Sequence, residues 1–142
     1  MALTVQQGAK VVLGGERHGA FYQPTVLVDV PKTADVAKDL EIFGPVVPVI
    51  GFDSVEEAIE IANASIFGLS GAVFSRDVGK ALTVARALEC GGAVINGCSF
   101  FRSCEMPFGG YKMSGIGNEG IMCSLEEVTQ IKTIVLKNVL AA

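Results

Sequence analysis

The sequence has no tryptophan and a single histidine, and charged residues make up only 18% of the chain. Its net charge is −4 and it contains no run of basic residues, so we do not expect nucleic acid as a partner. No apolar stretch approaches the roughly eighteen residues of a membrane span. The N-terminus has no basic region followed by an apolar block, so we expect no signal peptide and a cytoplasmic location.

The four cysteines have no spacing that indicates a metal site. They are Cys90, Cys98, Cys104 and Cys123, and no pair of them is separated by two residues. A structural zinc site needs four ligands at characteristic spacings, and His18 lies far from all of these thiols. We therefore expect four reduced cysteines, no bound metal and no disulfide framework.

Apolar side chains are abundant. They make up half of the 142 residues, which is enough for the core of one domain. With so few charged residues, this apolar fraction is high for an independent soluble domain. We expect the surplus apolar surface to contact other parts of a larger protein.

Apolar periodicity and turn residues predict most of the elements. We expect strands over residues 10–13, 24–31, 46–52, 71–75 and 93–96, a short helix from a Thr33 cap to Leu40, and helices opening at Ser54 and Asp77. Glu57 follows Ser54 at the spacing of a capping box. Residues 46–96 therefore predict a βαβαβ core, an α/β fold with a parallel sheet and flanking helices.

The last third of the chain is less regular. Residues 97–120 show no period and are dominated by glycine, serine and proline, which predicts a long irregular loop with a functional role. Residues 124–127 indicate a helical turn, and Ile131–Lys137 alternates as a C-terminal strand.

Glu41-Ile-Phe-Gly-Pro-Val46 places an acid directly before a turn that glycine and proline enforce. A carboxylate can accept hydrogen bonds from two vicinal hydroxyls, as in ribose. Phe43 would lie on the same side as Glu41 in an extended chain and could pack against a flat ring. The alternative is a solvent-facing acid and a core phenylalanine.

The second motif is Pro107-Phe-Gly-Gly-Tyr-Lys-Met-Ser-Gly115. We expect Lys112 to be structural, because its charge can satisfy carbonyls in a glycine-rich loop. The overlapping Gly115–Gly120 matches G-x-G-x-x-G in letters. A dinucleotide fingerprint also needs a preceding strand and an acid about twenty residues later, and neither is present.

These two motifs, in this order, resemble the C-terminal part of the aldehyde dehydrogenase family, from about Gly8 to Asn138. The resemblance implies that Glu41 binds the nicotinamide ribose of NAD or NADP and that Phe43 packs near the nicotinamide. It also implies that Phe108 lines the aldehyde tunnel and that Asn96 lies at the edge of the site. For Asn96 a turn-starting amide is an equal alternative.

Ser-Phe-Phe-Arg before Met-Pro-Phe-Gly-Gly resembles a subgroup of this family that acts on small hydroxy- or acid-bearing aldehydes. Arg102 could hold a carboxylate or phosphate through its planar guanidinium. The alternative is an ordinary surface arginine.

The resemblance also implies what this chain lacks. None of the cysteines has the glycine-glutamine-x-cysteine context of the family nucleophile, so we expect no catalytic residue here. We expect residues 1–128 to be a partial catalytic domain without the Rossmann domain. Alone, the chain would be inactive and bind no cofactor.

Two other readings remain open at this point. The chain could be a non-catalytic interaction module or subunit of a split enzyme, or, less favoured, a free-standing nucleotide-binding domain. Residues 129–142 resemble the family's oligomerisation strand. A strand that is apolar on both faces is costly as a free edge, so we expect a homo-oligomer through residues 130–137.

Overall fold

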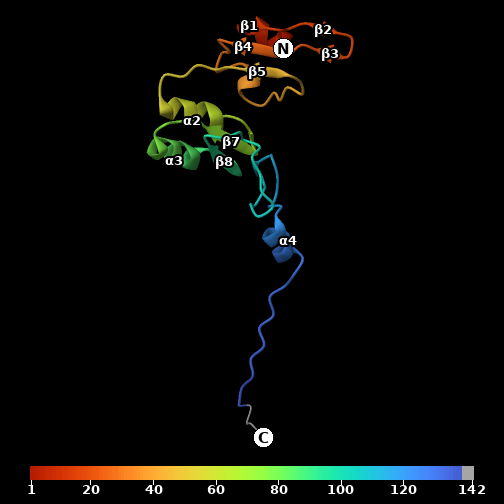
Figure 1. Ribbon diagram of the computed structural model, residues 1–142, viewed down its shortest axis with the longest axis vertical. Helices are drawn as coiled ribbons and strands as arrows, with labels where there is room; N and C mark the ends of the chain where they lie inside the picture. The colour runs from red at the N-terminus through yellow and green to blue at the C-terminus, as the bar shows by residue number, and fades with distance from the viewer. Residues whose placement is uncertain (139–142) are drawn as a thin grey trace.

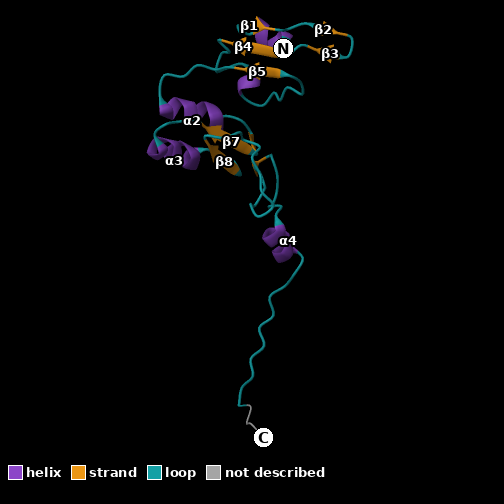
Figure 2. Ribbon diagram, in the orientation of Figure 1, coloured by secondary structure: helices purple, strands orange, loops and turns teal. Residues whose placement is uncertain are grey.

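Residues 1–138 of the protein are described by a computed structural model. Figure 1 shows them as an elongated molecule, with the N-terminal elements at one end and the C-terminal segment leading away from the other. Figure 2 shows that helices and strands are interleaved along the chain up to α3 and β8.

The N-terminal part is a small sheet with one helix and a hairpin. It comprises α1 (Ala2–Gln6), β1 (Lys10–Leu13), β2 (Arg17–His18), β3 (Phe21–Tyr22), β4 (Thr25–Val28), a 3-10 helix (Asp35–Ala37) and β5 (Val46–Pro48). The sheet order is β1-β4-β5, with β1 antiparallel and β5 parallel to the central β4. Leu27 on β4 is fully buried and packs with Ala9, Val30 and Ala34.

The second part is built from three helices and two short strand pairings. It comprises α2 (Val55–Asn63), β6 (Phe67–Gly68), β7 (Ser70–Val73), α3 (Val78–Ala87), β8 (Gly92–Ile95), β9 (Tyr111–Lys112) and α4 (Ile121–Glu127). β7 and β8 pair in parallel, α3 contacts both, and α2 lies against α3 (Figure 2). β6 and β9 pair antiparallel.

The helix caps predicted at Ser54 and Asp77 are confirmed. The Ser54 hydroxyl accepts from the Glu57 N–H at 3.1 Å, and the Asp77 carboxylate accepts from the Lys80 N–H at 3.0 Å. These bonds satisfy backbone donors that have no partner within the helix. The Glu57 carboxylate accepts from the N–H of Asp53 at 2.7 Å, one residue before the position that a capping box predicts.

The α/β class is confirmed, but the predicted βαβαβ unit is divided between two sheets. Among residues 1–138, β5 pairs with β4 and not with β7. β5 runs parallel to β4, and the Val49 N–H just beyond its end donates to Leu27 of that strand at 2.8 Å. Pro48 has no N–H to donate to a further strand, and β5 ends there after three residues.

The predicted helix over residues 33–40 is wrong in length and in its cap. The structure has only the 3-10 turn Asp35–Ala37, which has no side-chain cap. The 3-10 turn has Ala34 at its N-cap, one residue after Thr33, and the Ala34 N–H donates to the Pro31 carbonyl at 2.9 Å. In contrast, the helical turn expected at residues 124–127 is part of a longer α4.

Residues 129–138 form no hydrogen-bonded strand within the described chain. Their apolar side chains face solvent, with Ile131 fully exposed and Leu136 81% exposed. Pairing of residues 130–137 with a partner stays a prediction, and residues 139–142 of the predicted oligomerisation segment lie outside the described residues.

The surplus apolar surface expected from composition is present. Large exposed side chains include Phe43, Phe74, Phe100 and Ile116. Their burial against other parts of a larger protein stays a prediction. No helix within residues 1–138 combines the length and apolarity needed to cross a membrane. The cytoplasmic location also stays a prediction.

Candidate functional site

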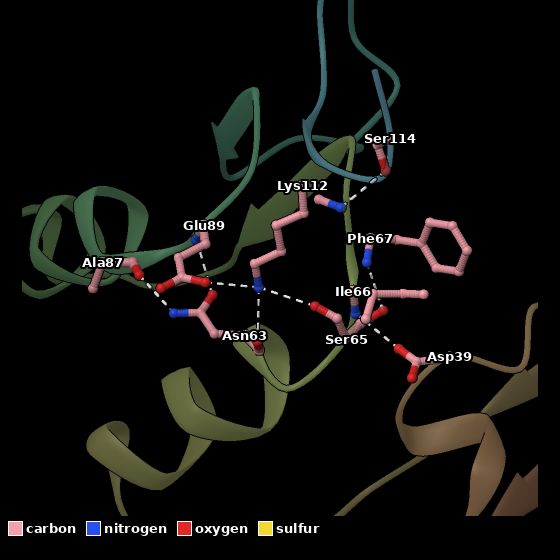
Figure 3. Close-up of polar contacts among 10 residues, drawn as sticks. Asp39, Asn63, Ser65, Ile66, Phe67, Ala87, Glu89, Lys112 and Ser114 are labelled. Atoms are coloured by element: carbon pink, nitrogen blue, oxygen red, sulfur yellow. Dashed lines mark hydrogen bonds and ion pairs between the residues drawn. The ribbon is translucent and has the colours of Figure 1, made fainter. Parts of the chain in front are cut away.

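Lys112 occupies a junction between the glycine-rich loop and the end of α2 (Figure 3). Its Nζ donates to the carbonyls of Asn63 at 2.8 Å and Ser65 at 2.9 Å, and lies 2.7 Å from the Glu89 carboxylate. The last carbonyls of a helix have no intrahelical donor and carry partial negative charge. A lysine ammonium satisfies both, which agrees with the structural role expected for Lys112. The two carbonyls belong to the last residue of α2 and to Ser65 just beyond it, and not to the loop of Lys112 itself.

Asn63 extends this junction to α3. Its amide donates to the Ala87 carbonyl at 2.8 Å and accepts from the Glu89 N–H at 2.9 Å (Figure 3). The nitrogen and the oxygen of this one amide therefore tie the end of α2 to the end of α3. Because Lys112 contacts Asn63 and Glu89 as well, the glycine-rich loop is fixed to both helix ends at once.

The same loop is held along β6. The Ser114 hydroxyl accepts from the Gly68 N–H at 2.9 Å. Gly68 also accepts from the Gly91 N–H at 3.0 Å. A Cβ on Gly68 would collide with the carbonyl oxygen of Glu89, so only glycine fits at this crossing.

Glu41 lies at an open groove of about 710 Å³ beside this junction. The groove is bounded by the segment that carries Glu41 on one side and by Phe67, Cys90 and Ser114 on the other. The Asp39 carboxylate accepts from the Ile66 N–H at 2.8 Å, and the Ile66 carbonyl accepts from the Met113 N–H at 2.9 Å (Figure 3 shows the first contact). Ile66 thus connects the residue two positions before the Glu41 motif with Met113 of the second motif.

The Glu41 side chain is exposed and makes no hydrogen bond to other parts of residues 1–138. Its carboxylate oxygens are therefore open to a ligand with neighbouring hydroxyls. Phe43 is 93% exposed and does not line the groove. Phe43 is therefore not in the core of the described residues, while the exposed Glu41 agrees with the solvent-facing acid of the alternative. The cofactor roles of both residues stay predictions.

Arg102 and Phe108 lie together in a second, smaller hollow of about 290 Å³. The guanidinium carbon of Arg102 is 3.7 Å from the centroid of the Phe108 ring, a stacked cation–π contact. One guanidinium nitrogen lies 3.3 Å from the Glu119 carboxylate. Phe108 and Glu119 also exchange two backbone hydrogen bonds of 2.7 Å. The two residues that Arg102 contacts are therefore paired with each other through their backbones.

Asn96 lies apart from both hollows, in a recess with Phe74, Ser75 and Arg76. Its backbone is left-handed, with a φ of 56°. The side-chain amide accepts from the Ser75 N–H at 2.8 Å and donates to the Ser75 carbonyl at 2.9 Å. Both contacts are to Ser75, 21 residues away in the sequence, so the amide links the end of β8 to the end of β7. The role of Asn96 at the edge of the site stays a prediction.

Cys90 is the cysteine that lines the groove. Burial raises the pKa of its thiol above the ordinary value of 9.0, against the opposing effect of backbone hydrogen bonds with Gly92 and Gly71. A raised pKa favours the neutral thiol over the nucleophilic thiolate. Among the described residues, no three histidine, cysteine or acidic side chains gather closely enough to hold a metal ion.

Sequence reasoning missed Asp39, Asn63 and Glu89. Asn63 ends α2 and Glu89 follows α3, and polar residues at helix ends are too common to indicate a site. Asp39 precedes Glu41 by two residues, and no pattern in the sequence names its partner, Ile66.

These contacts define a mixed α/β unit in which two loops from distant parts of the sequence meet at one groove. The model of the aldehyde dehydrogenase family matches residues 1–134. The chain belongs to the aldehyde dehydrogenase family.

Individual members of the family are similar over nearly the whole chain. A lactaldehyde dehydrogenase from Methanococcus maripaludis is 42% identical over 96% of this chain and 29% of its own length. The structure of glyceraldehyde-3-phosphate dehydrogenase GapN from Methanocaldococcus jannaschii, complexed with NADP, is 44% identical with a TM-score of 0.85, covering 94% of this chain and 28% of that one.

A betaine aldehyde dehydrogenase from Staphylococcus aureus, in complex with NAD⁺, is 42% identical with a TM-score of 0.83, covering 89% of this chain and 26% of that one. Solved neighbours of this chain are thus aldehyde dehydrogenases bound to NADP or NAD⁺. The chain spans less than a third of the length of the relatives it matches.

Proposed function

We propose that this chain forms the nicotinamide-facing and substrate-facing segment of an NAD(P)-dependent aldehyde dehydrogenase, which oxidises an aldehyde to a carboxylic acid. The observation that carries the proposal is the link from Asp39 through Ile66 to Met113, which brings the Glu41 segment and the glycine-rich loop to one groove. A ligand in that groove would meet both motifs.

Glu41 and Phe43 are the proposed cofactor contacts. The free carboxylate of Glu41 fits the two hydroxyls of a nicotinamide ribose, and the exposed ring of Phe43 is available to pack against a flat heterocycle. When bound, the nicotinamide accepts a hydride. This chain would orient that end of the cofactor, while the pyrophosphate site would lie elsewhere in the enzyme. The chain alone would then hold NAD or NADP weakly or not at all.

Arg102 and Phe108 are the proposed substrate contacts, with Asn96 at the margin of the site. The cation at Arg102 favours an aldehyde with a hydroxyl, carboxylate or phosphate group near the reacting carbon. Two of the similar proteins are named for a lactaldehyde and for glyceraldehyde 3-phosphate, which fits this choice. Asn96 is already bonded to Ser75, so its contribution would be to shape the wall.

We further propose that residues 1–128 belong to the catalytic domain and that residues 129–142 form an oligomerisation strand. The exposed apolar side chains of residues 131–136 support a homo-oligomer through residues 130–137. The complete enzyme would supply the cysteine nucleophile, the general base and the Rossmann domain.

The test is an activity assay of the 142-residue chain with and without the remaining part of an aldehyde dehydrogenase. Covalent catalysis needs a positioned thiolate, so we expect no reduction of NAD or NADP by the chain alone with short aldehydes. Turnover by the purified chain would overturn the proposal.

Two alternatives are separated by related measurements. Activity that appears when the chain is mixed with a separately made upstream part would identify a subunit of a split enzyme. Calorimetric titration of the chain with NAD tests the free-standing nucleotide-binding domain, for which saturable binding is required.

A further inference from the structure

Hydrogen bonds and ion pairs connect residues 1–50 to residues 53–138 at two places within the described chain. One is the ion pair between Lys32 and Glu57. The other is the hydrogen bond from the Ile66 N–H to the Asp39 carboxylate. The Asp39 contact lies two residues before Glu41, whereas the Lys32 contact lies nine residues before it.

The segment around Glu41 is held at its two ends and is free between them. At its start, the Leu40 N–H donates to Asp35 of the 3-10 turn at 3.0 Å. At its end, the Pro45 carbonyl accepts from the Thr25 N–H at 2.8 Å. Both of these bonds tie the segment to the N-terminal sheet and its turn. Neither sets its distance from the glycine-rich loop.

The Asp39 bond supplies that missing constraint. Ile66 uses its N–H for Asp39 and its carbonyl for Met113. Ser65, the residue before Ile66, gives its carbonyl to Lys112 at 2.9 Å. One short stretch, residues 65–66 just before β6, thereby contacts Asp39 near Glu41 and also contacts the glycine-rich loop (Figure 3).

We infer that Asp39 is a positioning residue, which sets the place of the Glu41 carboxylate across the groove from the glycine-rich loop. This inference rests on the proposed cofactor role of Glu41. Asp39 acts through Glu41 and touches no reacting group itself. Because reacting atoms tolerate little misplacement, a shift of about 1 Å in the segment is enough to cost up to about a hundredfold in rate.

The first test uses the 142-residue chain and needs no activity. Hydrogen exchange followed by NMR measures the protection of the Ile66 amide, whose N–H donates to the Asp39 carboxylate. Asp39→Asn should keep this amide protected, since an amide oxygen still accepts. Asp39→Ala should lose the protection. Glu60→Ala removes an exposed acid of α2 and should leave the protection unchanged. An Ile66 resonance that behaves identically in Asp39→Ala and the unaltered chain overturns the inference.

The second test uses a complete aldehyde dehydrogenase that carries this segment, and it separates positioning from general damage. Asp39→Ala should slow hydride transfer about ten- to hundredfold with little change in the dissociation constant of the cofactor. Asp39→Asn should restore most of the rate. In a Glu41→Gln background, Asp39→Ala should add little further loss, because coupled residues are not additive.

The outcomes also distinguish this inference from the function on which it rests. If Glu41→Gln slows hydride transfer and Asp39→Ala does not, Glu41 keeps its role and the positioning role of Asp39 is refuted. The positioning role is also refuted if Asp39→Ala lowers the rate of hydride transfer by the same factor in the unaltered enzyme and in the Glu41→Gln variant. If Glu41→Gln has no effect on rate or cofactor binding, the proposed cofactor role fails first, and the inference falls with it.

Discussion

Lys32, in the loop after β4, forms an ion pair with Glu57 in the first turn of α2. Their hydrogen bond lowers the pKa of the Glu57 carboxyl below 4.5, helped by the N–H of Asp53, and raises the pKa of Lys32 above 10.5. A group with a depressed pKa contributes stability above its unfolded pKa and loses it as the pH falls through the folded value. A group with a raised pKa contributes stability below its unfolded pKa and loses it as the pH rises through the folded value. The contribution of Lys32 is therefore lost only above pH 10.5.

Glu57→Gln should therefore lower the urea midpoint of unfolding at pH 7, and the difference from the unaltered chain should shrink as the pH falls below 4.5. The pair is partly exposed, so added salt should reduce the same difference. Glu60→Gln, which removes an exposed acid without a partner among the described residues, should show neither trend. A constant difference between pH 7 and pH 3 would contradict this assignment.

Lys112→Met should destabilise the chain by about 1–3 kcal/mol, because hydrogen bonds to a charged group contribute at the upper end of the range for hydrogen bonds. The methionine keeps a similar stem but leaves the Asn63 and Ser65 carbonyls without their donor. Urea unfolding followed by circular dichroism measures the change. The matched variant is Lys10→Met, whose ion pair with Asp29 is exposed, and it should have only a small effect. An equal loss of stability in both variants would show that the Lys112 contacts contribute no more than an exposed ion pair.

Glu41→Gln, in a complete enzyme carrying this segment, should slow hydride transfer more than it weakens cofactor binding. The proposed contact is confined to the nicotinamide end, where misplacement costs rate more than affinity. Single-turnover kinetics give the rate of hydride transfer, and fluorescence titration gives the dissociation constant of the cofactor. A large rise in that constant with unchanged turnover would refute this role for Glu41.

Removal of residues 129–142 should convert an oligomer into a monomer or an aggregating species. The side chains of Ile131, Ile134, Val135 and Leu136 are exposed in the single chain, and an unpaired apolar strand invites another strand. Sedimentation velocity of the intact and shortened chains measures the change. An intact chain that sediments as a single monomeric species would count against the proposed interface.

Local features of this fold were predictable from the sequence. The caps at Ser54 and Asp77 depend on residues within three positions, and both predictions are confirmed. The strand around Leu27 was predictable because its β-branched neighbours favour a half-buried sheet.

Features of the fold that depend on contacts between distant parts of the sequence could not be predicted. β6 and β9 are two residues each, and their pairing of Phe67 with Lys112 depends on the tertiary junction. The partner of β5 was equally beyond local reasoning, since periodicity predicts a strand without naming its neighbour. At the site, the two motifs identified Glu41 and the glycine-rich loop, but Asp39 has no feature that distinguishes it from any acid before a turn.

The β6–β9 pairing also bears on the order in which the chain acquires its structure. Its two strands are about twice as far apart in sequence as β7 and β8, and each doubling of a closed loop costs about 0.6 kcal/mol in chain entropy. During synthesis β6, β7, α3 and β8 leave the ribosome before Tyr111. The β7–β8 pair and α3, which contacts both strands, can therefore assemble first. The loop with Phe108 and Lys112 is then the last part of the site to settle, and a nascent chain halted before it would hold the helix pair without the groove.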